Sequence, residues 1–153
     1  MAGDGTFPDD YDRVCEAEAG EVGFVDVGEN GAQALVLGDL PSRTCYLAEH
    51  RVFLRCIGAE SDAGLTAAAE AVLADSATVW EECGRWVTDG PAVLMDSTDA
   101  GAEVNVPYPD GGDLPEQAPV PLPDRRWRVR GVFNVQPDAV NWFSLVQLVP
   151  ADA

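Results

Sequence analysis

The chain has 153 residues, of which 46% are hydrophobic and 24% charged, a composition typical of a folded domain rather than a disordered chain. Its 27 acidic residues are opposed by nine arginines and no lysine, which gives a formal net charge of −18. Nucleic acid and anionic membrane surfaces would repel such a chain, so both are excluded as partners and a basic partner is expected.

The length predicts a single domain over residues 1–153, with an acidic and largely irregular N-terminal segment over residues 1–21. No apolar run approaches the length of a membrane span. The first residues also lack the basic and apolar regions of a signal peptide. We therefore expect a cytoplasmic protein.

Short apolar runs separated by turn residues follow residue 21, at the spacing typical of a β-sandwich or barrel. Ser61 and Asp62 precede the one convincing helical stripe, which predicts a helix near residues 62–75. The expected fold class is mainly β: a two-sheet antiparallel β-sandwich with one packed α-helix. The predicted strands are 22–27, 32–37, 43–48, 51–57, 78–82, 85–88, 92–96, 126–133 and 142–149.

The stretch from residue 107 to residue 124 contains six prolines and two adjacent glycines. Proline removes a backbone donor and restricts the backbone, so we predict a long loop without regular structure here.

The strand over residues 126–133 has a clear two-residue period, with apolar residues on one face and arginines on the other. We expect the apolar face to lie in the core and the arginines to meet carboxylates of neighbouring strands. The apolar face holds Trp127, Val129 and Phe133, and the arginine face holds Arg126, Arg128 and Arg130.

Catalytic and metal-binding motifs are absent from the sequence. The only histidine, His50, lies in a predicted turn and is expected to be a surface group rather than a catalytic base. The chain has no nucleophile elbow, phosphate-binding glycine loop or metal-binding histidine pair. We predict no enzymatic activity, no cofactor and no metal. The cysteines, expected to be reduced and mostly buried, are Cys15, Cys45, Cys56 and Cys83.

A second hypothesis stays open, because paired carboxylates have no sequence signature. The chain could be a small β-sandwich hydrolase or carbohydrate-binding module, with a groove lined by carboxylates and flanked by exposed tryptophans. Tryptophans at strand positions more often lie in the core, and we expect the same here. The carboxylates are Asp96, Asp99, Glu81 and Glu82, and the tryptophans are Trp80, Trp86 and Trp142.

Negative charge is concentrated in two segments. Residues 1–29 contain nine acidic side chains against one arginine, and residues 86–124 contain eight and no basic one. Irregular segments can present side chains to a partner without disturbing the core. The predicted partner-binding residues are Asp9, Asp10, Asp12, Glu16, Glu18, Asp110, Asp113 and Glu116.

Several short stretches, in order along the chain, together resemble the immunity protein 21 family of bacterial polymorphic toxin systems. The stretches are 10–15 (DYDRVC), 34–39 (ALVLGD), 41–44 (PSRT), 52–55 (VFLR), 90–97 (GPAVLMDS) and 126–130 (RWRVR). The residues that carry the resemblance most directly are Asp10, Tyr11, Asp12, Gly38, Asp39, Asp96 and Ser97.

The resemblance implies a protein that binds and neutralises a toxin encoded beside it, and it supplies no catalytic residues. The charge of −18 adds the expectation that the toxin is cationic. Nuclease toxins fit, because their phosphate-binding surfaces are cationic and an acidic protein can occupy them.

Overall fold

The computed structural model describes residues 22–27, 32–37, 43–95 and 117–151, and its contacts divide the chain into two compact units. Strands β5 and β8 each run through the division, so the chain passes between the units within regular structure. That the chain forms a single domain stays a prediction. The described part of unit 1 is residues 22–27, 32–37, 86–95 and 117–125, and that of unit 2 is residues 43–85 and 126–151.

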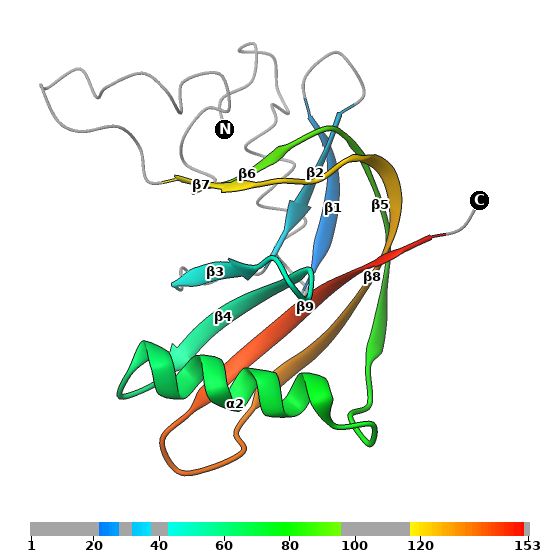
Figure 1. The fold of residues 1–153 in the computed structure, drawn as a ribbon. Coiled ribbons are helices and arrows are strands. Elements are labelled where there is room, and N and C mark those ends of the chain that lie inside the picture. Colours follow the sequence, from blue (N-terminus) through cyan, green and yellow to red (C-terminus); the bar gives the residue numbers. More distant parts are fainter. Residues whose placement is uncertain (1–21, 28–31, 38–42, 96–116, 152–153) are drawn as a thin grey trace, which may run out of the picture. The chain divides into compact units, whose positions relative to one another are not determined.

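Nine strands and one helix make up the regular structure of these residues, which confirms the predicted mainly β fold. The elements in chain order are β1 (Gly23–Val27), β2 (Ala32–Val36), β3 (Thr44–Leu47), β4 (Val52–Gly58), α2 (Asp62–Ala74), β5 (Glu81–Asp89), β6 (Ala92–Met95), β7 (Gln117–Val120), β8 (Asp124–Val135) and β9 (Trp142–Pro150) (Figure 1).

The strands of the described residues form three sheets, where two were predicted. The largest has five strands in the order β3-β4-β9-β8-β5, and the other two are the pairs β1-β2 and β6-β7. The pairings of β4 with β9 and of β8 with β9 are antiparallel, as expected. Helix α2 packs on β4 and β9, which Figure 1 shows as the helix lying across these strands.

One core cluster of unit 2 lies between α2 and the sheet. Alternate residues of the paired strands point to the same face, and Leu54 stands opposite Leu145 in the register of β4 and β9. The helix contributes residues one turn apart. The buried members of this cluster are Val52, Leu54, Leu65, Ala69, Phe143 and Leu145.

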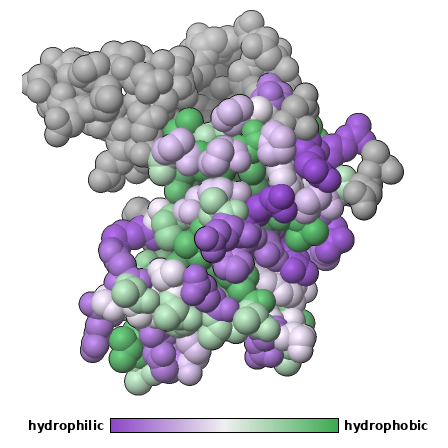
Figure 2. Space-filling view, in the orientation of Figure 1, coloured by the Kyte–Doolittle hydropathy of each residue, from purple (hydrophilic) through white to green (hydrophobic). Residues whose placement is uncertain are grey.

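Helix α2 begins where the sequence predicts it. The hydroxyl oxygen of Ser61 accepts a hydrogen bond from the Gly64 amide at 3.0 Å, which satisfies one of the free first-turn donors. Asp62 places a carboxylate in the first turn, where the helix dipole favours it. The outer face is rich in exposed alanines, and the surface over α2 is pale green interrupted by purple in Figure 2.

In unit 1, Trp86 is buried and its indole nitrogen donates to the Gln33 carbonyl oxygen at 3.1 Å. The side-chain oxygen of Gln33 accepts from the Val87 amide, also at 3.1 Å. Because β5 lies at an edge of its sheet, this bond satisfies a donor that an edge strand would otherwise leave open. The other buried apolar residues of unit 1 are Val25, Val36, Val120 and Leu122.

The two strands predicted over residues 78–82 and 85–88 were separated wrongly: one continuous strand, β5, covers residues 81–89, and residues 78–80 lie outside it. The prediction placed a break at Cys83 and Gly84. Gly84 has a φ of 142°, a conformation that a side chain would make costly. Glycine therefore lets the strand continue where the sequence pattern indicated a turn.

The prediction that residues 107–124 lack regular structure is wrong for their last part. Strand β7 contains Pro119, which stands opposite Val93 in an antiparallel pair with β6. Each strand of a two-stranded sheet has an open edge, and proline is tolerated there because no ladder bond needs its missing N–H. Residues 107–116 lie outside the described part of the chain.

Strand β8 confirms the predicted alternation over residues 126–129, but Phe133, which was expected in the core, is only half-buried. Trp127 and Val129 are buried, whereas Arg128 is exposed. The register with β9 shifts between Val132 and Val135, the signature of a bulge or irregularity. Within this shift Asn134 has a φ of 55°.

Gly131, on β8, is expected to be intolerant of a side chain. A Cβ atom there would overlap the aromatic ring of Phe133, which folds back over the glycine. We expect Gly131→Ala to lower the free energy of unfolding by about 1–3 kcal/mol, as for other overpacked sites. In a Phe133→Ala background, Gly131→Ala should lower the free energy of unfolding far less, because the ring that the new Cβ would overlap is absent. Urea unfolding of the wild-type protein and the three variants tests this; an equal loss of unfolding free energy in both backgrounds would contradict it.

Candidate functional site

The sequence-predicted site residues lie outside the described part of the chain. This holds for every predicted partner-binding residue and for every residue that carries the family resemblance most directly. Their role in binding therefore stays a prediction. The first set is Asp9, Asp10, Asp12, Glu16, Glu18, Asp110, Asp113 and Glu116, and the second is Asp10, Tyr11, Asp12, Gly38, Asp39, Asp96 and Ser97.

The two units carry very different charge. Unit 1, residues 1–39 and 86–125, has 18 acidic residues and two arginines, a net charge of −16. Unit 2, residues 40–85 and 126–153, has nine acidic residues and seven arginines, a net charge of −2. Nearly all of the negative charge therefore belongs to unit 1.

One arginine on the arginine face of β8, Arg128, forms an ion pair with a carboxylate of a neighbouring strand, as predicted. Arg128 Nε lies 2.8 Å from Glu82 Oε1, and both side chains are about half exposed. Exposed pairs of this kind contribute at most about 1 kcal/mol. The Arg128–Glu82 pair matters here because it neutralises one carboxylate of unit 2.

Arg130 contradicts the prediction that each arginine meets a carboxylate. Its guanidinium lies 4.3 Å from the centre of the Trp80 ring and donates two hydrogen bonds to the side-chain oxygen of Gln147. Burial lowers the pKa of Arg130 from its usual range. The planar guanidinium suits a ring face and an amide oxygen, so it can be satisfied without a counter-ion. Arg126 is exposed.

The carboxylates proposed for a hydrolase do not converge where they are described. Glu81 and Glu82 are neighbours on β5, so their side chains point to opposite faces, and Glu82 is bound to Arg128. Asp96 and Asp99 lie outside the described residues. The contacts of the described pair are those of a sheet surface rather than of an acid–base pair.

The thiols in the described residues are free, but the prediction that they are mostly buried is wrong for Cys45, which is exposed. Cys56 and Cys83 are half-buried, and burial raises the pKa of Cys83 to about 11. At neutral pH the Cys83 thiol is therefore protonated and a weak nucleophile. Cys15 lies outside the described residues.

His50 lies in the turn between β3 and β4, as predicted, and is half-buried. Its backbone carbonyl oxygen accepts from Gln147 Nε2 at 3.0 Å. Within residues 22–27, 32–37, 43–95 and 117–151, no group of three or more histidine, cysteine or acidic side chains could hold a metal ion.

Sequence reasoning missed an exposed apolar set in unit 2. Trp86 and Trp127 are buried, but Trp142 is 40% exposed although it was expected in the core. Ile57 and Val140 are similarly exposed, at 43% and 42%. Gly58, next to Ile57, pairs with Trp142, so Ile57 and Trp142 lie at one end of the β4–β9 pair, and Val140 lies in the connection that precedes β9.

Asp138 holds together the connection between β8 and β9. One oxygen of its carboxylate accepts from the amides of Val140 and Asn141 at 2.8 and 2.7 Å, and the other accepts from Asn141 Nδ2 at 3.0 Å. These bonds, that of the Asn141 amide foremost, lower the pKa of Asp138. Its contribution to stability is therefore present above the unfolded-state pKa and is lost as the pH falls through the folded-state pKa.

The comparisons with known proteins identify the family. Residues 1–141 match the family described as Immunity protein 21, which is most of the chain. No curated protein and no solved structure matches the chain. Among the described residues, no helix is long and apolar enough to cross a membrane. The chain belongs to the immunity protein 21 family.

Proposed function

We propose that this immunity protein neutralises a cationic, nuclease-like toxin domain in the cytoplasm, by covering its active site or substrate surface. Membership of an immunity family supports a toxin as the partner. The observation that favours a cationic toxin is the charge of unit 1, which has 18 acidic residues against two arginines. Charge of one sign accelerates association with a partner of the other sign and repels wrong partners.

The proposed contact residues are the acidic side chains of residues 9–18 and 110–116. A nuclease binds phosphates through arginine and lysine, and carboxylates can occupy the same groups. The protein would therefore act by occupancy, without chemistry of its own. Unit 2 is a weaker candidate for this electrostatic role, because seven arginines nearly balance its acidic residues.

The test is co-expression of the protein with the toxin encoded by the neighbouring gene. We expect growth to be restored, and a stable complex to be recovered with an inactive form of the toxin. Purified toxin should cleave DNA or RNA, and one equivalent of the immunity protein should abolish the cleavage. Absence of both protection and complex would contradict the proposed function. A protected cell whose toxin has no nuclease activity and no basic surface would contradict its nuclease-like, cationic part.

A further inference from the structure

Two free thiols of unit 2 lie on the same face of the β3–β4 pair. Cys45 stands opposite Leu54 in the register, and side chains that stand opposite each other point to the same face. Leu54 belongs to the buried cluster beneath α2, and Cys56 packs against that same cluster. Both thiols therefore lie on the side of the sheet that α2 covers.

The register makes these two cysteines diagonal neighbours. The Cys56 amide donates to the Arg43 carbonyl oxygen at 2.8 Å, so Cys56 lies opposite Arg43, two residues before Cys45. The Cα atoms of diagonal neighbours are about 7–8 Å apart. A disulfide usually joins Cα atoms about 4.4–6.8 Å apart. The diagonal spacing is therefore too wide for a direct S–S bond, but one atom placed between the two sulfurs can bridge it.

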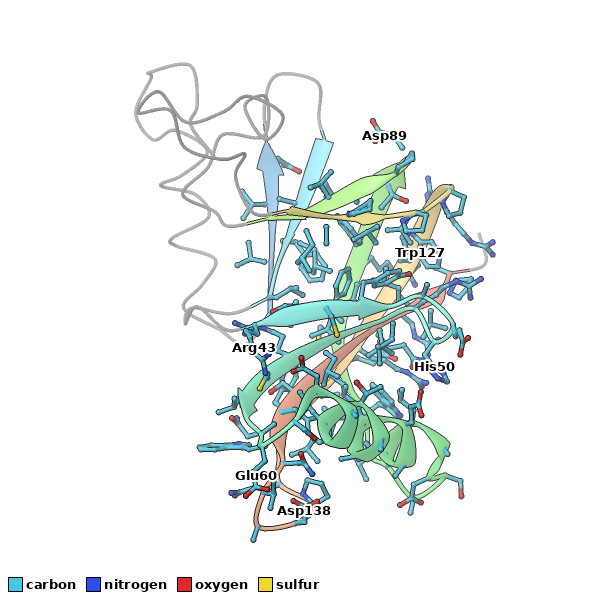
Figure 3. The ribbon with its side chains drawn as sticks, turned by 60° about the vertical axis from the view of Figure 1, so that its left-hand side comes forward. Arg43, His50, Glu60, Asp89, Trp127 and Asp138 are labelled. Atoms are coloured by element: carbon cyan, nitrogen blue, oxygen red, sulfur yellow. The ribbon has the colours of Figure 1, made fainter. Side chains whose placement is uncertain are left out.

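A guanidinium and a carboxylate lie beside the two thiols. Arg43 Nη2 donates to Cys56 Sγ at 3.7 Å, and Arg43 Nη1 lies 2.8 Å from Asp62 Oδ1, on the first residue of α2. Burial raises the pKa of the Cys45 thiol, and the charged groups that act on this thiol are Asp62, Arg43 and Cys56. Figure 3 shows Arg43 and His50 at opposite ends of the β3–β4 pair. The four groups therefore gather at the end of the pair away from its turn.

Two thiolates without a third ligand suit a soft ion of low coordination number. Thiolates select soft ions such as copper(I), which two sulfurs in line can satisfy. Structural zinc takes four protein ligands, and no group of three or more histidine, cysteine or acidic side chains in the described ranges could hold a metal ion. Two bonds of about 2.3 Å, the length of a zinc–thiolate bond, separate the sulfurs by about 4.6 Å. Cys45 is exposed, so an ion can reach it from solvent.

We propose that Cys45 and Cys56 form a binding site for one copper(I) ion, a property separate from toxin binding. No electron is transferred when the ion binds. Each thiol releases its proton to water, and each sulfur forms one bond to the metal. The resulting group has one net negative charge, which the neighbouring Arg43 guanidinium offsets. The bound ion joins β3, an edge strand of the five-stranded sheet, to β4.

The test uses the full chain with Cys15→Ser and Cys83→Ser, so that Cys45 and Cys56 are its only thiols. This parent variant is titrated without oxygen against copper(I) held by a coloured chelator, bathocuproine disulfonate, whose absorbance falls as the copper leaves it. We expect one ion per chain. Cys45→Ser and Cys56→Ser, each added to the parent variant, should weaken binding about 100-fold, because a second ligand on the same chain acts at a high effective concentration.

Two arginine variants test the role of the guanidinium. Arg43→Gln should weaken copper(I) binding several-fold. Arg85→Gln, which changes an exposed arginine on β5, should leave binding unchanged. Equal binding by these two variants would contradict the role of Arg43 in the site.

Three outcomes would overturn the copper(I) site itself. The parent variant could bind no copper(I), or Cys45→Ser could bind it as tightly as the parent variant does. An ion shared by two copies of the chain would appear as one ion per two chains. Cys45→Ser guards against a folding defect because Cys45 is exposed, and circular dichroism checks the fold of each variant.

Discussion

Replacing Phe143 by alanine is expected to lower the free energy of unfolding by about 3–5 kcal/mol, a large share of the 5–15 kcal/mol that stabilises a typical domain. Phe143 is fully buried and packs in the cluster that joins β4, β9 and α2. Its removal leaves a cavity at the middle of that cluster, which the flanking strands cannot close without breaking their register.

The adjacent residue provides the matched control. Trp142 points to the opposite face of β9 and is 40% exposed. Trp142→Ala removes a larger side chain, yet we expect it to lower the free energy of unfolding by less than Phe143→Ala does, because 40% of Trp142 already faces water. Urea unfolding followed by circular dichroism compares the two variants. Equal destabilisation would contradict both the burial of Phe143 and the exposure of Trp142.

Local signals were sufficient to predict the helix and strand β8. Ser61 lies directly before an apolar stripe with helical spacing, and the observed helix begins at the next residue. In β8 the alternation of arginine with apolar residues needs only the two-residue period of a strand. Both signals are contained in a short stretch of chain, so they can be recognised in the sequence without knowledge of the fold.

Strand β5 and strand β7 could not be predicted in the same way. The glycine in β5 is read as a turn signal unless its backbone conformation is known. Pro119 in β7 depends on a partner strand from residues 92–95, far along the chain. In both cases the structure depends on pairing across the chain, which a local pattern does not contain.

The partner-binding site was predicted from the concentration of negative charge, and its residues lie outside the described part of the chain. Within the described part, sequence reasoning found the Arg128–Glu82 pair but missed the exposure of Trp142. The two-residue period shows that Trp142 and Phe143 face opposite ways, but not which face the rest of the chain covers.

Neutralising Asp110, Asp113 and Glu116 together is expected to lower the association rate with the toxin about 10-fold at low salt. The changes to Asn and Gln reduce the charge of unit 1 from −16 to −13 and remove it from one segment. Because ions screen charges over about 10 Å at 0.1 M salt, the difference from the wild-type rate should shrink as salt is added. Stopped-flow association over a series of salt concentrations measures both effects.

The control for this experiment removes the same amount of charge from unit 2. Glu49, Glu70 and Glu81 are exposed, and their replacement by glutamine changes the net charge of the whole protein by the same three units. If the carboxylates of residues 110–116 face the toxin, the variant of these residues should associate more slowly than the control variant, although both have a net charge of −15. Equal rates would show that only the total charge matters, which would contradict the assignment of residues 110–116 to the interface. A rate that does not depend on salt in any of the proteins would contradict electrostatic steering itself, and association would then have to depend on apolar contacts such as those of Trp142.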